Sequence, residues 1–389
     1  MHLILQIIII AAYAFAGCYV VYILYFLSGF RRIKSHPLKR NNELPELTVV
    51  VCAKDEEEHI ENCVRSINSQ DYPPEKFSVI AVNDRSGDRT GEILNVLAGE
   101  QRNMKVLHLS SCPACISPKK HAITKALEHC ETEFIVATDA DAQHEPQWLR
   151  SYGSLCREEL GAATALSVFR KKHYRSPWER IWQSMQTLEA LSHNVVIAGA
   201  MGHGFAITAN GNNMMYRKDL FRDGKVLKGD VVTGDDSDIM YEAQRRGYEV
   251  EFNAHPASVV KLVPEDSIGA VINQRVRWAS QILKATFPVV VLGLTVFFFY
   301  LSTILLPFLA IADLSVLPWW AGLVIIKAVC DLGYMGITLK KFGIAYRFRH
   351  LLLMELVHAL FIVWIGLAGT FGKFTWKGKR YKQTLSENT

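Results

Sequence analysis

The sequence has no internal repeat and no low-complexity linker, which argues against a solenoid or a string of tethered modules. No Gly-x-Gly-x-x-Gly follows its first strand-like segment, so a dinucleotide-binding enzyme is a poor interpretation. Cysteine is scarce, with eight in 389 residues. The one close pair, Cys112 and Cys115, has no further ligands at zinc-binding spacing, so we expect free thiols rather than a zinc site.

The amino-terminal end lacks the lysines or arginines of a secretory signal, because Met1 and His2 supply neither. The apolar run from Leu3 to Leu27 is long enough to span a bilayer, which needs about 20 apolar residues. We therefore expect an uncleaved anchor over residues 1–30. Basic residues follow the run directly: Arg31, Arg32, Lys34, Lys39 and Arg40. Their juxtamembrane position favours a cytoplasmic helix end at the inner (plasma) membrane over a nucleic-acid site.

Short β-branched runs alternate with helical patterns in the middle of the chain, as in a soluble α/β enzyme. The runs predict strands at 47–53, 77–82, 105–109 and 133–138, and the patterns between them predict helices at 56–69, from 90 and at 119–130. This alternation is typical of a mostly parallel, Rossmann-like sheet, whose ligands lie beyond the carboxyl ends of the strands. We assign residues 45–285 to this domain.

The carboxy-terminal part, residues 286–372, contains three apolar stretches, at 287–312, 317–339 and 351–371, and a basic tail follows at 373–389. Both flanks of the last stretch are basic, so both favour the cytoplasm. The stretch also contains Glu355 and His358, which are costly at the centre of a bilayer. We therefore expect two spans and a third segment that dips in and returns, through a bend allowed by Gly366 and Gly369, or lies buried against other helices.

Acidic residues fall where strands end. Asp84 follows the second predicted strand, and Asp139 and Asp141 end a later one with the spacing Asp-x-Asp, which places both carboxylates on one side. The surface-loop alternative weakens because an apolar strand precedes this motif. Two carboxylates completed by water and substrate phosphates suit Mg²⁺, and Mn²⁺ is the other candidate cofactor.

A second acidic cluster, Asp235, Asp236 and Asp238, stands where a helix is predicted to begin, with Thr233 or Asp235 as its cap. Capping and catalysis are compatible here, because a cap position fixes a carboxylate. Farther along, Gln274, Arg277 and Trp278 share one helix face. An interfacial anchor is the alternative interpretation of that face.

Together these residues resemble the family-two inverting glycosyltransferases of the GT-A fold, over roughly residues 47–278. The run from Val51 to Glu57 is similar to the family's opening strand and its Asn-Glu-Glu turn, with Asp55 in place of Asn. Val82 to Asp88 resembles the Val-Asp-Asp-Gly-Ser-x-Asp loop, with Asn83 in place of the first Asp. Lys119 begins a segment similar to the Gly-Lys-x-x-Ala-Leu donor motif.

The resemblance continues into the second half of the domain. Gly211 to Arg217 is similar to the family's Gly-x-Asn loop, and Gly234 to Asp236 stands where the family has Thr-Glu-Asp or Gly-Asp-Asp. Gln274 to Trp278 matches the Gln-x-x-Arg-Trp motif of membrane-bound members. The tail from Trp376 to Tyr381 resembles a motif of bacterial relatives of ceramide glucosyltransferases.

This resemblance implies roles for individual residues. The implied donor-binding residues are Ala53, Asp55, Glu56, Asp84, Lys119, Asp139 and Asp141. The implied catalytic residues are Asp236 as general base, Asp235, and Arg277 beside the diphosphate. The implied acceptor-binding residues are Gly211, Asn212, Gln274 and Trp278, and the metal ligands are Asp141 and Asp139.

The function that follows is transfer of a sugar from a nucleotide-sugar, with uridine diphosphate sugars as the family-based expectation, to a lipid or glycan acceptor among membrane lipids. A processive polysaccharide synthase is the alternative, although four apolar segments are few for a polymer channel. A non-catalytic scaffold is disfavoured, because the residues that such chemistry needs are all present.

Overall fold

The computed structural model describes residues 2–113, 117–170, 176–224, 226–227, 234–282, 285–344, 348–376 and 379–381. Cys115 and Thr233, which enter the predictions above, lie outside these ranges. The chain forms two compact units. The sheet unit comprises residues 29–171, 196–264 and 375–389, and the helical unit comprises 1–28, 172–195 and 265–374.

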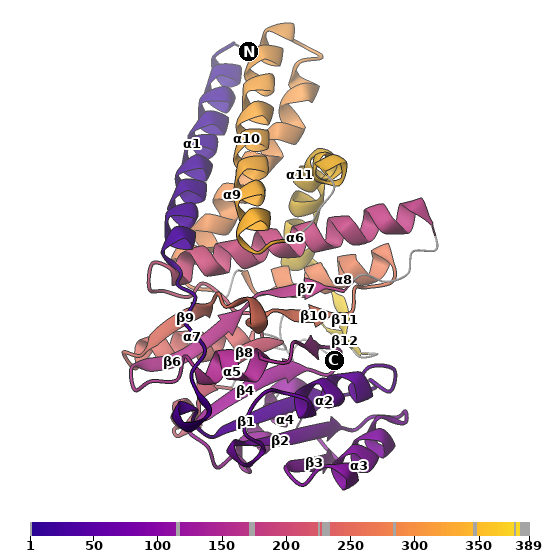
Figure 1. Cartoon of the computed structure of the whole chain (residues 1–389). Helices are drawn as coiled ribbons and strands as arrows, with labels where there is room; N and C mark the ends of the chain where they lie inside the picture. The colour runs from indigo at the N-terminus through magenta and orange to yellow at the C-terminus, as the bar shows by residue number, and fades with distance from the viewer. Residues whose placement is uncertain are drawn as a thin grey trace. The chain divides into compact units, whose positions relative to one another are not determined.

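A seven-stranded sheet forms the centre of the sheet unit, in the order β3-β2-β1-β4-β8-β6-β9 (Figure 1). β8 runs antiparallel to β4 and β6, and the other neighbours are parallel, so the mostly parallel sheet expected from the sequence is confirmed. The valine-rich β1 is buried along most of its length, as expected for a central strand. The strands are β1 Leu47–Ala53, β2 Phe77–Asp84, β3 Met104–Leu109, β4 Phe134–Asp139, β6 Leu160–Ala165, β8 Asn213–Arg217 and β9 Glu249–Asn253.

Helices follow the strands, as predicted, with shifted boundaries. The first helix begins at Ile60 rather than near Glu56, because side chains of the next loop bind the preceding turn: Glu56 N–H donates to Thr90 Oγ1 and Glu57 N–H to Asp88 Oδ2. The helices are α2 Ile60–Asn68, α3 Thr90–Glu100, α4 Pro118–Leu127, α5 Trp148–Gly153, α6 Pro177–Met201, which enters both units, and α7 Asp235–Arg245. A small sheet contains β5 Gln143–His144, β7 Ser167–Phe169 and β10 Val260–Leu262, and a hairpin contains β11 Phe374–Trp376 and β12 Lys379–Tyr381.

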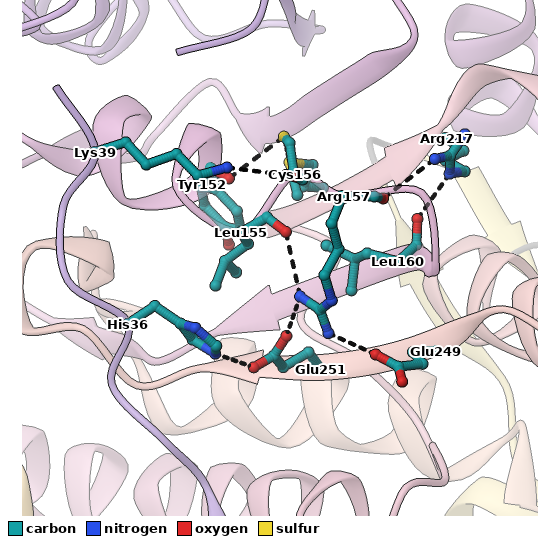
Figure 2. Close-up of polar contacts among 11 residues, drawn as sticks. His36, Lys39, Tyr152, Leu155, Cys156, Arg157, Leu160, Arg217, Glu249 and Glu251 are labelled. Carbon is teal, nitrogen blue, oxygen red and sulfur yellow. Dashed lines mark hydrogen bonds and ion pairs between the residues drawn. The ribbon is translucent and has the colours of Figure 1, made fainter. Parts of the chain in front are cut away.

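The basic segment after the first helix is tied to the sheet unit (Figure 2). His36 pairs with Glu251 on β9, and Arg157 bridges Glu251 at 2.9 Å and Glu249 at 2.6 Å. Lys39 Nζ donates to the carbonyl of Cys156 at 3.0 Å. Arg150 then holds the backbone of Lys39 and the side chain of Asn41 at 2.9 and 2.7 Å. These contacts fix the linker against β9 and α5.

The helical unit contains helices long and apolar enough to cross a membrane. They are α1 His2–Arg32, α9 Phe287–Leu309, α10 Leu317–Lys341 and α11 Phe348–Phe371, and α8 Ile268–Ala279 precedes α9. α1, α9 and α10 lie side by side (Figure 1), because Tyr13 OH donates to the Trp319 carbonyl at 2.9 Å and the hydroxyls of Tyr19 and Tyr300 are 3.1 Å apart.

The last apolar segment is one continuous helix, α11. The two glycines that could have allowed a bend serve packing instead: Gly369 lies against Ala279 and Gly366 against Phe297. The expected bend at these glycines is therefore wrong, and burial against neighbouring helices remains as the predicted alternative to a span.

Candidate active site at the carboxyl ends of the strands

Polar side chains meet at one edge of the sheet, where parallel strands end. β1 lies between β2 and β4, so Ala53, Asp84 and Asp139, the last residues of these strands, share an edge. β8 runs the other way and begins at this edge, since Asn213 pairs with Thr138, which brings Gly211 and Asn212 there. This is the location that a doubly wound sheet predicts.

Lys119 at the start of α4 is a buried cation among acids. Its Nζ lies 3.0 Å from Asp139 Oδ1 and 3.8 Å from Asp235 Oδ2. Burial lowers the pKa of Lys119, but the charges of Asp139 and Asp235 outweigh it and raise the pKa well above its ordinary value. Lys119 is therefore a permanent ammonium group, which suits the binding of a phosphate.

Asp236 lies in the first turn of α7, against the loop that contains Gly211. It accepts hydrogen bonds from the backbone N–H of Gly211 and from that of Ser237, the latter at 2.7 Å. A Cβ at Gly211 would lie 3.3 Å from the Asp236 Cβ, so this close approach favours glycine. Burial, and then the charge of Asp235, raise the pKa of Asp236 to about 6.

The start of α7 differs from one sequence prediction. Gly234 occupies the cap position with a φ of 92°, a left-handed conformation that glycine adopts at no steric cost. The alternative in which Asp235 caps the helix is therefore wrong, because Asp235 and Asp236 are the first two helical residues. Both carboxylates still lie at the positive end of the helix dipole.

Asp139 and Asp141 are the candidate metal ligands. Asp141 lies in the turn directly after β4 and is half-buried. Among the residues that the structure describes, no group of three or more His, Cys, Asp or Glu side chains could enclose an ion. Two carboxylates nevertheless fit Mg²⁺ or Mn²⁺ of the kind that takes its remaining ligands from water and substrate phosphates.

Asp55 and Glu56, two of the predicted donor-binding residues, join the turn after β1 to the segment after β2. Asp55, at a φ of 52°, accepts a hydrogen bond from the Gly87 N–H at 2.7 Å, and its own N–H donates to Ser86 Oγ at 3.0 Å. Glu56 is joined to the same loop through its backbone. The sequence analysis did not identify Arg85, whose guanidinium binds both oxygens of Asp84, at 2.7 and 2.9 Å. In the sequence, only the position of Arg85 next to Asp84 could have pointed to it.

Buried hydrogen bonds hold the Gly-x-Asn loop, residues 211–213, in place. Asn212 Oδ1 accepts from Ser167 Oγ at 2.6 Å, and its carbonyl accepts from Thr138 Oγ1 at 2.9 Å. The fully buried Asn213, the Asn of the Gly-x-Asn loop, to which the sequence analysis gave no role, accepts at Oδ1 from Trp148 Nε1 at 3.0 Å and from Tyr152 OH at 2.8 Å. These bonds fix the backbone beside Asp236.

The remaining predicted residues, Gln274, Arg277 and Trp278, lie on α8 in the helical unit. Gln274 Nε2 donates to Glu265 Oε1 at 2.9 Å. Trp278 is 40% exposed and stacks on His193, with ring centroids 6.3 Å apart. Arg275, not predicted to matter, pairs with Glu189 and lies 4.2 Å above the Trp278 ring. Its contacts hold the tryptophan in place.

The carboxy-terminal hairpin returns to the sheet unit. The described residues 375, 376 and 379–381 belong to that unit. Tyr381 is buried there, and burial raises the pKa of its phenol, with smaller effects from Cys112, Arg85 and Asp84. Tyr381 therefore lies within electrostatic range of Asp84.

Comparison with known proteins places the chain among sugar-transferring enzymes. Residues 45–281 match the family described as "Glycosyltransferase like family 2". A β-monoglucosyldiacylglycerol synthase of Trichormus variabilis is 26% identical over 259 residues, which are 64% of this chain and 52% of the relative. A poly-β-1,6-N-acetyl-D-glucosamine synthase of Staphylococcus epidermidis is 22% identical over 262 residues, 64% of this chain and 58% of that relative. The chain thus spans between half and two thirds of the length of these curated relatives.

Among solved structures, the mannosyltransferase PcManGT of Pyrobaculum calidifontis, in complex with GDP-Man and Mn²⁺, has a TM-score of 0.55 at 19% identity. The similarity covers 94% of this chain and 98% of that one. At this identity the likeness concerns the fold alone.

Proposed function

Because the chain belongs to glycosyltransferase family 2, we propose that it transfers a sugar from a nucleotide-sugar, of the UDP type, to a lipid-linked or membrane-proximal acceptor with inversion at the anomeric carbon. The family itself confirms the resemblance drawn from the motifs. The observation that carries the proposal is Asp236, a carboxylate with a pKa of about 6 at the strand-end edge that also holds Lys119 and Asp139.

Asp236 acts as general base. Its carboxylate takes the proton of an acceptor hydroxyl while that oxygen forms a bond to the anomeric carbon. The bond from that carbon to the diphosphate breaks on the opposite face, and its electron pair leaves with the phosphate oxygen. A base whose pKa lies near the working pH is effective in this role, and a placed base contributes roughly 10²–10⁴ in rate. The Gly211 and Ser237 N–H groups orient the carboxylate.

Fixed cations neutralise the negative charge of the leaving diphosphate. Lys119 is held as an ammonium by Asp139 and Asp235, and moves no proton at neutral pH. Asp141 and Asp139 are the residues that would hold Mg²⁺ or Mn²⁺, whose charge stabilises the diphosphate as it departs. The thiol of Cys52 is no competing nucleophile, because burial raises its pKa to about 12.

Acceptor binding is proposed for Gln274 and Trp278 on α8 and for Gly211 and Asn212 in the loop before β8. Trp278, with Arg275 and His193 against its ring, offers a fixed apolar surface for a sugar or a lipid, and Gln274 and Arg277 lie on the same helix face. We place the sheet unit on the cytoplasmic side of the inner membrane, because the basic residues after α1 favour that side. Single transfer and processive synthesis use the same groups, and the similar relatives include enzymes named for a glycolipid and for a polysaccharide.

The test is an assay of the full chain in lipid nanodiscs. UDP-sugars are supplied one at a time, and both UDP release and the masses of the lipid products are measured. Lipids that gain one sugar support single transfer, and a ladder of masses supports the processive alternative. Asp236→Asn should keep nucleotide affinity and lose at least about 10² in turnover, because a base contributes to the transition state rather than to ground-state binding. Absence of donor-dependent nucleotide release from the wild type would overturn the proposal.

A further inference from the structure

Helix α6 carries a polar stripe on one of its faces, in the part that belongs to the helical unit. Its members follow one another at intervals of three or four residues, so they share one side of the helix: Glu179, Gln183, Gln186, Glu189 and His193. Gln183 and Gln186 are only 5% and 2% exposed. They belong to none of the motifs described above. Buried polar side chains of this kind are normally hydrogen-bonded, so their partners decide what the stripe can do.

One end of the stripe lies against α8 (Figure 1). Arg275 Nε donates to Glu189 Oε2 at 2.7 Å, and the rings of His193 and Trp278 stack with their centroids 6.3 Å apart. Trp278 is 40% exposed. The stripe therefore runs from a partly exposed tryptophan, which we assign to the acceptor, into the buried interior of the helical unit.

The two glutamine side chains each keep an unused acceptor. Gln186 Nε2 donates to the backbone carbonyl of Glu265 at 3.0 Å, which fixes the orientation of that amide. Gln183 Nε2 donates to Glu179 Oε1 over a long 3.5 Å. Within the part of the chain that the structure describes, the Oε1 atoms of both glutamines are buried and have no hydrogen-bond partner. A buried oxygen without a partner destabilises the fold, and a hydrogen bond donated to it removes that cost.

These oxygens define the ligand by its chemistry. An amide oxygen only accepts hydrogen bonds, so the ligand must donate them, through hydroxyl or amide N–H groups. Residues three apart on a helix have Cβ atoms about 5–6 Å apart, which lets one headgroup reach both glutamines. Glu179 and Glu189 bring negative charge to the stripe, and the guanidinium of Arg275 is already paired with Glu189. A phosphate headgroup would therefore meet like charge, and a neutral ligand is favoured.

We propose that Gln183 and Gln186 bind hydroxyl groups of the acceptor, and that this acceptor is a neutral lipid alcohol rather than a lipid phosphate. The inference rests on the proposed function, since it names the acceptor class for the same transfer. The glutamine oxygens accept hydrogen bonds from the headgroup, and the ring of Trp278 packs against its apolar part. Both glutamines hold the headgroup and take no part in the exchange of bonds.

The test compares two matched lipids with the full chain in phosphatidylcholine nanodiscs. Monooleoylglycerol is neutral and has two free hydroxyls, and oleoyl lysophosphatidic acid has the same acyl chain and a phosphate. Thermal unfolding reports binding, because a ligand of the folded state raises the midpoint. Gln183→Met and Gln186→Met remove the oxygens at similar side-chain length. Ser184→Ala is the matched control, because Ser184 lies on another face of α6 and donates to the Arg180 carbonyl of its own helix at 2.8 Å.

The wild type is expected to gain in unfolding midpoint with monooleoylglycerol and not with lysophosphatidic acid. Each Met variant should need about threefold to tenfold more monooleoylglycerol for the same gain, the loss expected for one hydrogen bond. Without added lipid, Gln183→Met should unfold at or above the wild-type midpoint, because it removes an oxygen that is buried without a partner. Ser184→Ala should match the wild type in both measurements.

The two hypotheses fail separately. A wild type that responds to monooleoylglycerol but releases UDP from no UDP-sugar overturns the proposed transfer, and the glutamines then bind a lipid that is not an acceptor. A wild type that turns over its donor, beside Met variants that respond to monooleoylglycerol as the wild type does, overturns only the role of the glutamines. Met variants that merely unfold earlier have the same meaning. A wild type that responds to neither lipid overturns the site, and a preference for lysophosphatidic acid overturns the neutral class.

Discussion

At the scale of the residue, Asp236 determines how the reaction should respond to pH. Burial and the charge of Asp235 raise its pKa to about 6, and only its ionised form accepts a proton. Turnover of the wild type is therefore expected to fall about tenfold for each unit of pH below about 6. A pH–rate profile at saturating donor measures this. A rate that stays level down to pH 5 would contradict the assignment, and the residual activity of Asp236→Asn should lack this acid limb.

The same raised pKa predicts a cost in stability. The folded protein binds the Asp236 proton more tightly than the unfolded chain, so this contribution is favourable below about pH 4 and is lost as pH rises through about 6. Asp236→Asn removes the charge and should raise the free energy of unfolding at pH 7.5, by at most about 3 kcal/mol for two pKa units. Melting at pH 7.5 and at pH 4.5 checks this. The gain should be about three times smaller at pH 4.5 than at pH 7.5, and Asp223→Asn, on the surface, should show none.

Asp141 gives a prediction about metal. EDTA should abolish transfer, and Mg²⁺ or Mn²⁺ should restore it, because the leaving diphosphate needs the charge. Asp141→Ala should lose at least about 10² in turnover and should not recover with excess ion, since the ion loses a protein ligand. Glu145→Ala, a change in the same segment of a residue paired with Lys261, is the matched control. Full activity in excess chelator would remove the metal from the mechanism.

Some residues of the site could be predicted from the sequence, whereas the contacts of others could not. Asp84 and Asp139 end hydrophobic runs, so their placement at one sheet edge follows from strand periodicity alone. The left-handed φ of Arg85, the ion pairs of Lys119 and the buried hydrogen bonds of Asn213 could not be predicted, because they depend on residues far apart in sequence that meet only in the fold. Sequence pattern therefore locates carboxylates better than it locates their partners.

At the scale of the element, a cluster of buried polar side chains joins the membrane helices. Lys327 Nζ on α10 lies 2.8 Å from Asp331 Oδ2 and also pairs with Glu355 on α11. Tyr300 OH on α9 donates to Asp331 at 3.2 Å, and Tyr19 OH on α1 donates to the same carboxylate. The cluster thus links four helices, and Lys327 offsets charges that hydrocarbon would otherwise disfavour.

Lys327→Met is therefore expected to destabilise the helical unit strongly, by about 3–5 kcal/mol, because it leaves two buried carboxylates without their cation. Thermal unfolding in detergent, followed by tryptophan fluorescence, measures the loss. Lys327→Arg keeps the charge and should lie close to the wild type. A Met variant as stable as the wild type would mean that neighbouring groups or water already neutralise the carboxylates.

The elements themselves were predictable where the sequence is strongly periodic. The valine- and isoleucine-rich runs of β1, β2 and β4 gave strands within one or two residues of their ends. The start of α2 was misplaced by four residues, because loop side chains, rather than helix propensity, bind the Glu56 and Glu57 N–H groups. The unbroken course of α11 depends on the packing of Gly366 and Gly369, which no local pattern reveals.

At the scale of the whole molecule, the count of spans determines on which side of the membrane the tail lies. If α1 brings the chain into the cytoplasm, α9 and α10 carry it out and back again. α11 has 24 residues, about 36 Å at the helical rise and enough to cross. A crossing would leave the tail outside. The described tail residues 375, 376 and 379–381 belong to the sheet unit, however, and Tyr381 is buried there.

We therefore predict that α11 begins and ends on the cytoplasmic side. A single cysteine replacing Lys373, which is exposed between α11 and the hairpin, should resist an impermeant thiol reagent in intact cells when the other cysteines are removed. It should react once the cells are opened, which shows that the thiol is accessible. A cysteine replacing Asp313, in the turn between α9 and α10, should react in intact cells and serves as the control for the outer side. Labelling of both positions from outside would make α11 a true span, and the tail would then be unable to reach the nucleotide site.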